Sequence, residues 1–200
     1  MKKDFVYLAS ASPRRSELLR QIGVPFEVRP ADIKEEQLDA EAPAAYVLRL
    51  SAAKAEAVWA AVPEAERRPV LAADTTVVLA GQVLGKPLDA AEAVDMLERL
   101  SGRTHHVLTA VALRVGGGVE TRLSESEVRF RATTAAERVR YCATGEPFDK
   151  AGGYGIQGRA AVFVEELRGS YSGVVGLPLF ETAELLARHG FGFWLTARAA

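Results

Sequence analysis

The residues of this chain that could do chemistry carry two kinds of charge, placed near the ends of predicted strands and helices. The candidate cations are Arg14, Arg15, Lys54 and Lys86, and the candidate carboxylates are Glu35, Asp74 and Asp149. Ammonium and guanidinium groups bind phosphate oxygens, and carboxylates supply the oxygen ligands that Mg²⁺ or Mn²⁺ prefers. Together they indicate a phosphorylated ligand bridged by a divalent metal.

The two adjacent arginines lie in the stretch LASASPRRSELL, which starts at Leu8. A strand over residues 5–8 and a helix over residues 13–22 are predicted, with Ser12 at the N-cap and Pro13 at the first helical position. Cations at a helix N-terminus oppose the helix dipole unless an anion joins them. Arg14 and Arg15 therefore indicate an anion site, and the alternative is that both are solvated surface residues.

Lys54 lies within an alanine-rich helix that we predict over residues 43–62. At helical spacing it falls on the apolar stripe of Val47, Leu50 and Val58, which should pack inward. A lysine on that face delivers its ammonium to a partly enclosed anion, or else its stem packs while the ammonium reaches solvent.

Asp74 ends a predicted apolar strand over residues 70–74, where small and polar residues replace branched ones, and residues 76–79 are again predicted as buried strand. A carboxylate in that position is typical of a metal ligand or a general base, and the alternative is a turn-forming aspartate. Glu35, in an acidic loop over residues 31–36, is a candidate second ligand for the same ion; the alternative is a solvated loop.

Two further segments favour a ligand site. Lys86 stands in a predicted turn at residues 85–87, and residues 148–158 are rich in glycine while carrying Asp149 and Gln157. Glycine permits close backbone approach to a ligand, although a mobile connector has the same composition. Neither a P-loop nor a dinucleotide-binding fingerprint is present in the sequence.

The elements that must position these residues alternate between strand and helix, followed by a predicted hairpin of residues 105–115 and 119–130 and a later apolar strand over residues 161–165. This pattern predicts one α/β domain over residues 1–200 with a mixed sheet, divided into two lobes by a cleft. The net charge of −1 excludes a general basic field for nucleic acid, and no segment predicts a membrane span. The single cysteine, Cys142, is expected to be a buried helical residue in a cytoplasmic protein.

The sequence resembles the Maf family of nucleoside triphosphate pyrophosphatases. The matching stretches are LASASPRRSELL at Leu8, AADTTVVLAGQVLGKP at Ala72, LSGRTHHVLTAV at Leu100, FDKAGGYGIQG at Phe148 and YSGVVGLPL at Tyr171. The resemblance implies an elongated α/β fold with a central mixed sheet flanked by helices, shared with the inosine triphosphatase enzymes. It also implies hydrolysis between the α and β phosphates of a nucleotide. Thr76 and Ala110 depart from the pattern, but neither offers a ligand.

The resemblance marks Asp74 as the proton acceptor and assigns substrate choice to Arg14, Thr75 and Gln157, in the form similar to the subgroup that acts on dTTP and UTP. Ser10 is a further expected substrate contact. Arg15, Lys54 and Lys86 are expected to bind the triphosphate tail, and Glu35 with Asp74 to hold one Mg²⁺ or Mn²⁺.

Two other functions stay open at this point. One is a nucleotide-sensing protein linked to septum formation, which binds without turnover. The other is a pyrophosphatase for methylated guanine nucleotides, which depends on the identity of residue 157. The expected partner is a nucleoside triphosphate, without nucleic acid or membrane, and a homodimer is compatible with the sequence.

Overall fold

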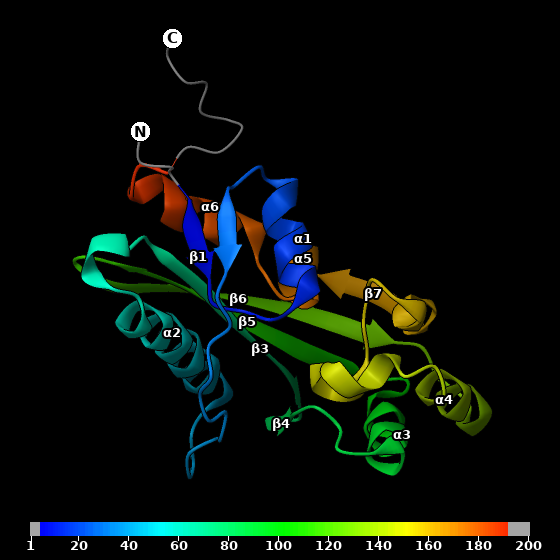
Figure 1. Ribbon diagram of the computed structural model, residues 1–200. Helices are drawn as coiled ribbons and strands as arrows, with labels where there is room; N and C mark the ends of the chain where they lie inside the picture. The colour runs from blue at the N-terminus through cyan, green and yellow to red at the C-terminus, as the bar shows by residue number, and fades with distance from the viewer. Residues whose placement is uncertain (1–4, 192–200) are drawn as a thin grey trace. The chain divides into compact units, whose positions relative to one another are not determined.

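The computed structural model describes residues 5–191, and its helices and strands alternate along much of the chain (Figure 1). The strands are β1 (Val6–Leu8), β2 (Phe26–Val28), β3 (Val70–Leu79), β4 (Gln82–Leu84), β5 (Thr104–Val115), β6 (Gly118–Phe130) and β7 (Val164–Arg168). The α-helices are α1 (Pro13–Gln21), α2 (Pro43–Ala61), α3 (Ala90–Leu100), α4 (Ala135–Cys142), α5 (Tyr171–Val175) and α6 (Leu179–Arg188). Short 3₁₀ turns are η1 (Glu64–Glu66), η2 (Glu146–Asp149), η3 (Ala151–Gly153) and η4 (Arg159–Phe163).

The sheet is mixed, as the sequence predicts. Its strand order is β2-β1-β3-β5-β6-β7, and β4 pairs with β3 off this path. β1 runs parallel to β2 and to β3, with Val6 opposite Phe26 and Tyr7 opposite Val70, whereas β3 with β4 and β6 with β7 are antiparallel. The α/β class with helices and a mixed sheet is therefore confirmed.

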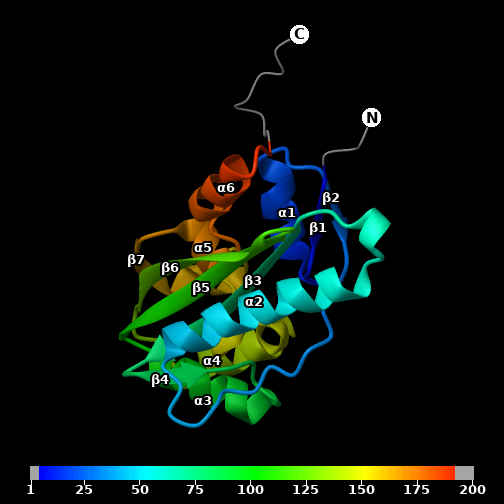
Figure 2. The same cartoon turned by 90° about the vertical axis from the view of Figure 1, so that its left-hand side faces the viewer.

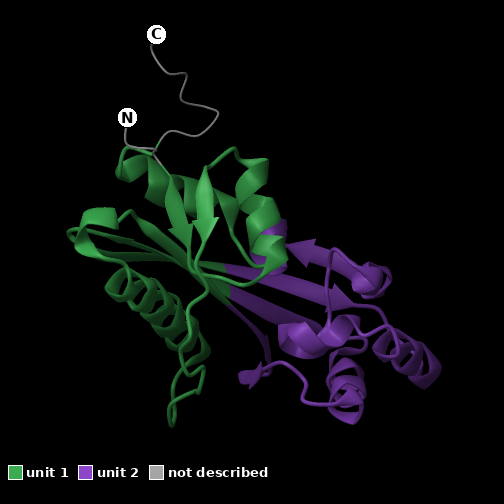
Figure 3. Cartoon of the chain, in the orientation of Figure 1, with its two compact units in different colours: residues 1–74, 109–124, 176–200 green, residues 75–108, 125–175 purple. Residues whose placement is uncertain are grey.

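The chain divides into two compact units, each built from separate stretches of sequence (Figure 3). Unit 1 contains residues 1–74, 109–124 and 176–200, and unit 2 contains residues 75–108 and 125–175. Residues from both units contribute to β3, β5 and β6. One domain over residues 1–200, and a cleft between two lobes, stay predictions.

In unit 1, α1 and α6 lie on one side of the strands and α2 lies on the other (Figures 1 and 2). Ala55 and Val58 of α2, with Val62 directly after the helix, pack against Tyr7 and Val70 of the strands. Helical spacing places Lys54 one turn before Val58, so the same packing that buries the apolar stripe carries the lysine inward.

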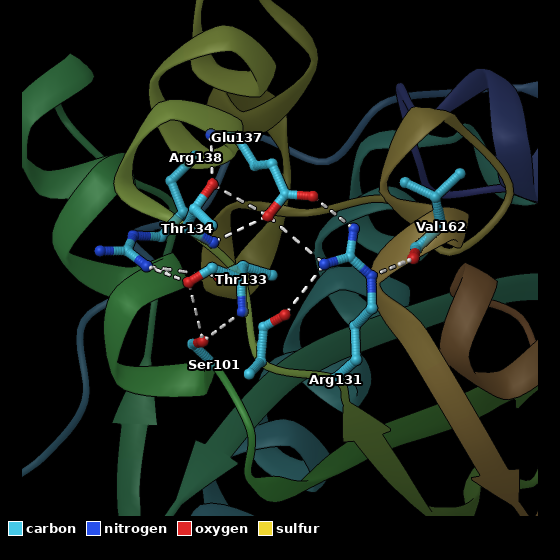
Figure 4. A network of polar contacts seen from close by, with 8 residues as sticks. Ser101, Arg131, Thr133, Thr134, Glu137, Arg138 and Val162 are labelled. Carbon is cyan, nitrogen blue, oxygen red and sulfur yellow. Dashed lines mark hydrogen bonds and ion pairs between the residues drawn. The ribbon is translucent and has the colours of Figure 1, made fainter.

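In unit 2, α3 and α4 pack side by side (Figure 1), and a polar network ties the start of α4 to its neighbours (Figure 4). Thr134 and Glu137 form a capping box, and Arg131 donates to the Glu137 carboxylate at 2.7 Å and to the Val162 carbonyl at 3.0 Å. Ser101, at the end of α3, accepts from the Thr133 amide at 2.7 Å. Of these bonds, those of the capping box satisfy backbone amides that a helix start leaves unpaired.

The predicted boundaries need three corrections. The strand predicted over residues 161–165 is wrong for its first half, because residues 159–163 form η4 and β7 begins at Val164. The short helix α5 was not predicted. β3 continues without a break to Leu79, because threonines at 75 and 76 have β-branched side chains that suit a strand as well as valine does.

Cys142 ends α4 as a free, buried cysteine, as predicted. Among the described residues, no helix has the length and apolar character that crossing a membrane requires.

Candidate active site

The centre of the candidate site is an ammonium between two carboxylates, all within unit 1. Lys54 Nζ lies 2.6 Å from Asp74 Oδ1 and 2.7 Å from Glu35 Oε1. The Lys54 and Asp74 side chains are 9% and 7% exposed, whereas Glu35 is 41% exposed. Lys54 is therefore buried and paired, which excludes the alternative in which its ammonium reaches solvent.

Asp74 lies inside β3 and not at the end of a strand, which corrects the prediction and excludes the turn-forming alternative. Burial raises the pKa of its carboxyl group, and the neighbouring Lys54 and Arg15 charges oppose that rise. Burial favours the protonated form of this carboxyl group, whereas the two cations favour its ionised form. Such a group is suited either to accept a proton or to bind a cation.

The loop that carries Glu35 is held by two α2 residues that the sequence analysis did not identify. Tyr46 Oη donates to the Glu35 carbonyl at 3.0 Å, and Arg49 donates to the Glu36 carbonyl at 2.9 Å. Arg49 also makes a two-pronged contact with the Glu41 carboxylate at 2.6 and 2.7 Å. Tyr46, eight residues before Lys54, lies on the same side of α2, and that spacing is a signal that could have pointed to it.

Arg15 links two other segments of unit 1. Its Nε donates to the Gly176 carbonyl at 2.8 Å, and its Nη1 donates to Ser10 Oγ at 3.3 Å. Burial lowers the pKa of Arg15, while the charges of Asp74 and Glu35 oppose that change. Arg15 and Ser10 thus lie in direct contact, and Arg15 is electrostatically coupled to the acidic pair.

The start of α1 differs in detail from the prediction. Ser12 occupies the N-cap position as expected, but its side chain makes no capping bond; instead, Ser10 Oγ accepts from the Ser12 amide at 3.1 Å. Arg14 lies half-buried in the first turn of α1, beside Arg15 in sequence. The Ser12 side chain therefore does not cap the helix, and Ser10 Oγ accepts from two donors, the Ser12 amide and Arg15 Nη1.

The remaining candidates belong to unit 2. Thr75 follows Asp74 in β3 and is half-buried, whereas Lys86 and Gln157 are exposed. The Gly152 amide donates to the Gly85 carbonyl at 2.9 Å, so the Lys86 turn adjoins the glycine-rich segment. Asp149 accepts from its neighbour Lys150 at 2.5 Å.

The residues fit a divalent cation in one respect. Glu35 and Asp74 reach the same point in space, since both contact one ammonium, and Mg²⁺ is commonly held by one or two carboxylates together with waters and substrate phosphates. Within residues 5–191 no group of three or more His, Cys, Asp or Glu side chains is arranged to hold a metal. Glu35 and Asp74 are therefore the two carboxylates that meet at this point, and both contact the Lys54 ammonium.

Comparison with known proteins gives a consistent result. The family model described as Maf-like protein matches residues 5–189. A dTTP/UTP pyrophosphatase of Aromatoleum aromaticum is 54% identical and covers 93% of this chain and 96% of its own. Proteins with the same name from Chromobacterium violaceum and Cupriavidus pinatubonensis are 52% and 56% identical, covering 93% and 92% of this chain and 95% and 96% of their own.

A solved structure, the Staphylococcus aureus Ham1 protein, matches 62% of this chain and 71% of its own at 14% identity and a TM-score of 0.40. That likeness is too weak to support a statement about function. The sequence relatives are more than half identical and the family model extends over nearly the whole chain. This chain therefore belongs to the Maf-like protein family.

Proposed function

We propose that this protein hydrolyses dTTP and UTP to the nucleoside monophosphate and pyrophosphate, and so removes nucleotides from the cytoplasmic pool. The observation that carries the proposal is the buried Asp74 carboxylate next to Lys54, with Arg15 and Glu35 coupled to it. The relatives named dTTP/UTP pyrophosphatase support the choice of substrate.

In this proposal Asp74 accepts the proton of the attacking water, and the cations bind the triphosphate. Arg15, Lys54 and Lys86 stabilise charge that builds on the pyrophosphate leaving group, and such contacts lower the barrier when they strengthen in the transition state. Ser10, in contact with Arg15, presents a hydroxyl to the same anion.

Glu35 and Asp74 would hold one Mg²⁺ or Mn²⁺. When bound, such an ion polarises a phosphoryl oxygen and lowers the pKa of a coordinated water. Tyr46 and Arg49 keep the Glu35 loop close to Lys54 through its backbone carbonyls.

In this proposal Gln157 reads the base, and Arg14 and Thr75 also govern the choice of substrate. Uracil and thymine present a carbonyl acceptor beside an N3–H donor, which one amide can meet with its donor and its acceptor. Among the residues that the structure describes, the Gln157 amide has no hydrogen-bond partner and is exposed. This supports a ligand-reading role over a role in bracing its own loop.

The test is pyrophosphate release from UTP, dTTP, GTP and 7-methyl-GTP with added Mg²⁺, by wild type and by Asp74→Asn. We expect turnover of UTP and dTTP, and a loss of at least about a hundredfold in folded Asp74→Asn, because the amide neither accepts the proton nor binds a hard cation well.

Three results would contradict the proposal. Binding of UTP without pyrophosphate release above a boiled control would favour a sensor, and preferred turnover of 7-methyl-GTP would favour the methylated-guanine activity. A folded Asp74→Asn enzyme that keeps most of its activity would remove Asp74 from the reaction.

A further inference from the structure

Glu146, a residue outside the candidate site, accepts hydrogen bonds from the glycine-rich turn of unit 2, residues 155–160, and from the neighbouring Tyr141. Its Oε1 accepts from Tyr141 Oη at 2.9 Å and from the Ala160 amide at 3.5 Å, and its Oε2 accepts from the Arg159 amide at 3.0 Å. Arg159 and Ala160 begin η4, so the carboxylate satisfies amides that a helix start leaves unpaired. Glu146 and Arg159 are thirteen residues apart in the sequence.

Tyr141 extends the contact to the other end of the turn. The Gly155 amide donates to Tyr141 Oη at 3.2 Å while the same hydroxyl donates to Glu146. Tyr141 is buried, and burial together with the Glu146 carboxylate raises its pKa, so the hydroxyl keeps the proton that it donates. Glu146 and Tyr141 thus bind the turn at residues 155, 159 and 160.

The close approach of Glu146 also explains two of the glycines. A Cβ at Gly158 would overlap the Glu146 carboxylate, with the carboxyl carbon only 2.5 Å away, and a Cβ at Gly155 would lie 3.3 Å from Oε1 and 2.8 Å from Lys150 Cε. A side chain at either position would have to displace the end of the Glu146 or the Lys150 side chain. Gly155 and Gly158 therefore leave room for the Glu146 carboxylate against the turn.

Gln157 lies in the turn between Gly155 and Arg159, whose amides are bound by Tyr141 and Glu146. The Gly158 amide donates to the Gly155 carbonyl at 3.0 Å and closes the turn, and Ile156 and Ala160 are buried in the core of unit 2. Gln157 is the exposed residue next to Ile156. The backbone conformation that presents its amide is set by the bonds at residues 155, 158, 159 and 160.

We infer that Glu146 is a positioning residue for base recognition, acting through Gln157. This inference rests on the proposed function, in which Gln157 reads uracil or thymine. Three donors converge on the carboxylate, and an amide in its place presents one acceptor and one donor. In Glu146→Gln the side-chain NH₂ group therefore faces a backbone N–H of Arg159 or Ala160, which is also a donor. The turn then loses a hydrogen bond that fixes the position of Gln157.

The experiment compares kcat/KM for UTP and GTP in wild type, Glu146→Gln, Gln157→Ala and the double variant. Glu165→Gln is the matched control, because Glu165 lies in the same unit, is exposed and pairs with Arg129 on the surface. We expect Glu146→Gln to lower the UTP-to-GTP ratio at least about tenfold, the loss typical of one mismatched polar contact. In the Gln157→Ala background the same change should leave the ratio unmoved, since the effect passes through Gln157.

Two outcomes would overturn the inference: a folded Glu146→Gln enzyme with the wild-type ratio, or an equal effect of Glu146→Gln on the ratio with and without Gln157. If Glu146→Gln does not fold, Tyr141→Phe tests the same contact, because it removes the donor to Glu146 and the acceptor for Gly155.

A failure of the proposed function is recognised separately. It would appear as a wild-type enzyme that releases no pyrophosphate from UTP or dTTP. The contact of Glu146 and Tyr141 with the turn can then still be measured by amide hydrogen exchange. Exchange should become faster at Gly155, Arg159 and Ala160 in Glu146→Gln and stay unchanged in Glu165→Gln.

Discussion

At the scale of single residues, Lys54 is the buried cation of the candidate site. Its ammonium is the shared partner of Asp74 and Glu35, in a place where the Asp74 side chain is only 7% exposed. Removing one member of a buried ion pair leaves an uncompensated charge, which typically costs about 3–5 kcal/mol. Lys86, by contrast, is exposed in the turn after β4.

Replacement of the two lysines should therefore separate stability from catalysis. We expect Lys54→Met to lower both Tm and kcat/KM, and Lys86→Met to lower kcat/KM with Tm nearly unchanged, since solvated charges change stability by only about 0–1 kcal/mol. Thermal unfolding and steady-state kinetics measure the two effects. Both variants should depress UTP and dTTP hydrolysis by similar factors. A tenfold change in the UTP-to-dTTP ratio would place that lysine at the base or sugar.

A second prediction at the scale of residues concerns the choice of base by Gln157. Guanine presents N1–H and an exocyclic amino group side by side, for which a carboxylate with two acceptors is the better partner. Gln157→Glu should weaken UTP and dTTP hydrolysis by roughly ten- to a hundredfold and narrow the gap to GTP and 7-methyl-GTP. Values of kcat/KM for the four nucleotides decide it. Equal losses on all four would mean that residue 157 supports the turn and does not read the base.

At the scale of elements, the start of α4 is held by charge. Arg131 donates to Glu137, which also accepts from the Thr134 amide at 2.7 Å (Figure 4). The bond from Arg131, followed by that from Thr134, lowers the pKa of Glu137 from an ordinary 4.5 to about 2. A carboxyl group with a lowered folded-state pKa stabilises the fold above 4.5, and that contribution is lost as pH falls towards about 2.

Glu137→Gln should therefore destabilise the protein at neutral pH but not in strong acid. We expect the difference in the free energy of unfolding between wild type and variant to be largest near pH 7 and to shrink between 4.5 and about 2. Urea titrations across that pH range measure the difference, with Glu165→Gln as the control for loss of one surface carboxylate. A difference independent of pH would mean that the Glu137 charge contributes nothing.

At the scale of the whole molecule, charge is balanced and only local clusters attract anions. The chain has 25 Lys and Arg residues against 26 Asp and Glu residues, a net charge of −1. Binding to duplex DNA depends on many cations that displace counterions, and this balance does not supply them. A nucleotide site needs only a few charges, such as Arg15 and Lys54.

Duplex DNA should consequently be a poor competitor for the site. We expect a short duplex in excess over UTP to leave the rate of pyrophosphate release unchanged at physiological salt. A fluorescence anisotropy titration of the labelled duplex provides a direct binding measurement. Inhibition that weakens as salt increases would reveal a basic surface that the net charge conceals.

The sequence by itself determined much of this protein. Proline and aspartate near helix starts, apolar strand segments and the spacing of α2 predicted most elements to within two residues and placed Lys54 on an inward face. Local chemistry controls those features: capping, periodicity and turn preference act over a few residues. The motifs around Asp74 and Gln157 likewise indicated the family, because a motif is a run of neighbouring residues that can be recognised before any contact is known.

Only the tertiary structure decided which groups meet. The pairing of Lys54 with both Asp74 and Glu35 and the contact of Arg15 with Gly176 join residues distant in sequence. Glu146 was missed because its partners, Tyr141 and the amides of residues 159 and 160, are brought to it by the path of the backbone. A sequence pattern records periodicity along the chain, whereas a carboxylate's pKa and its hydrogen bonds depend on neighbours that packing selects across the chain.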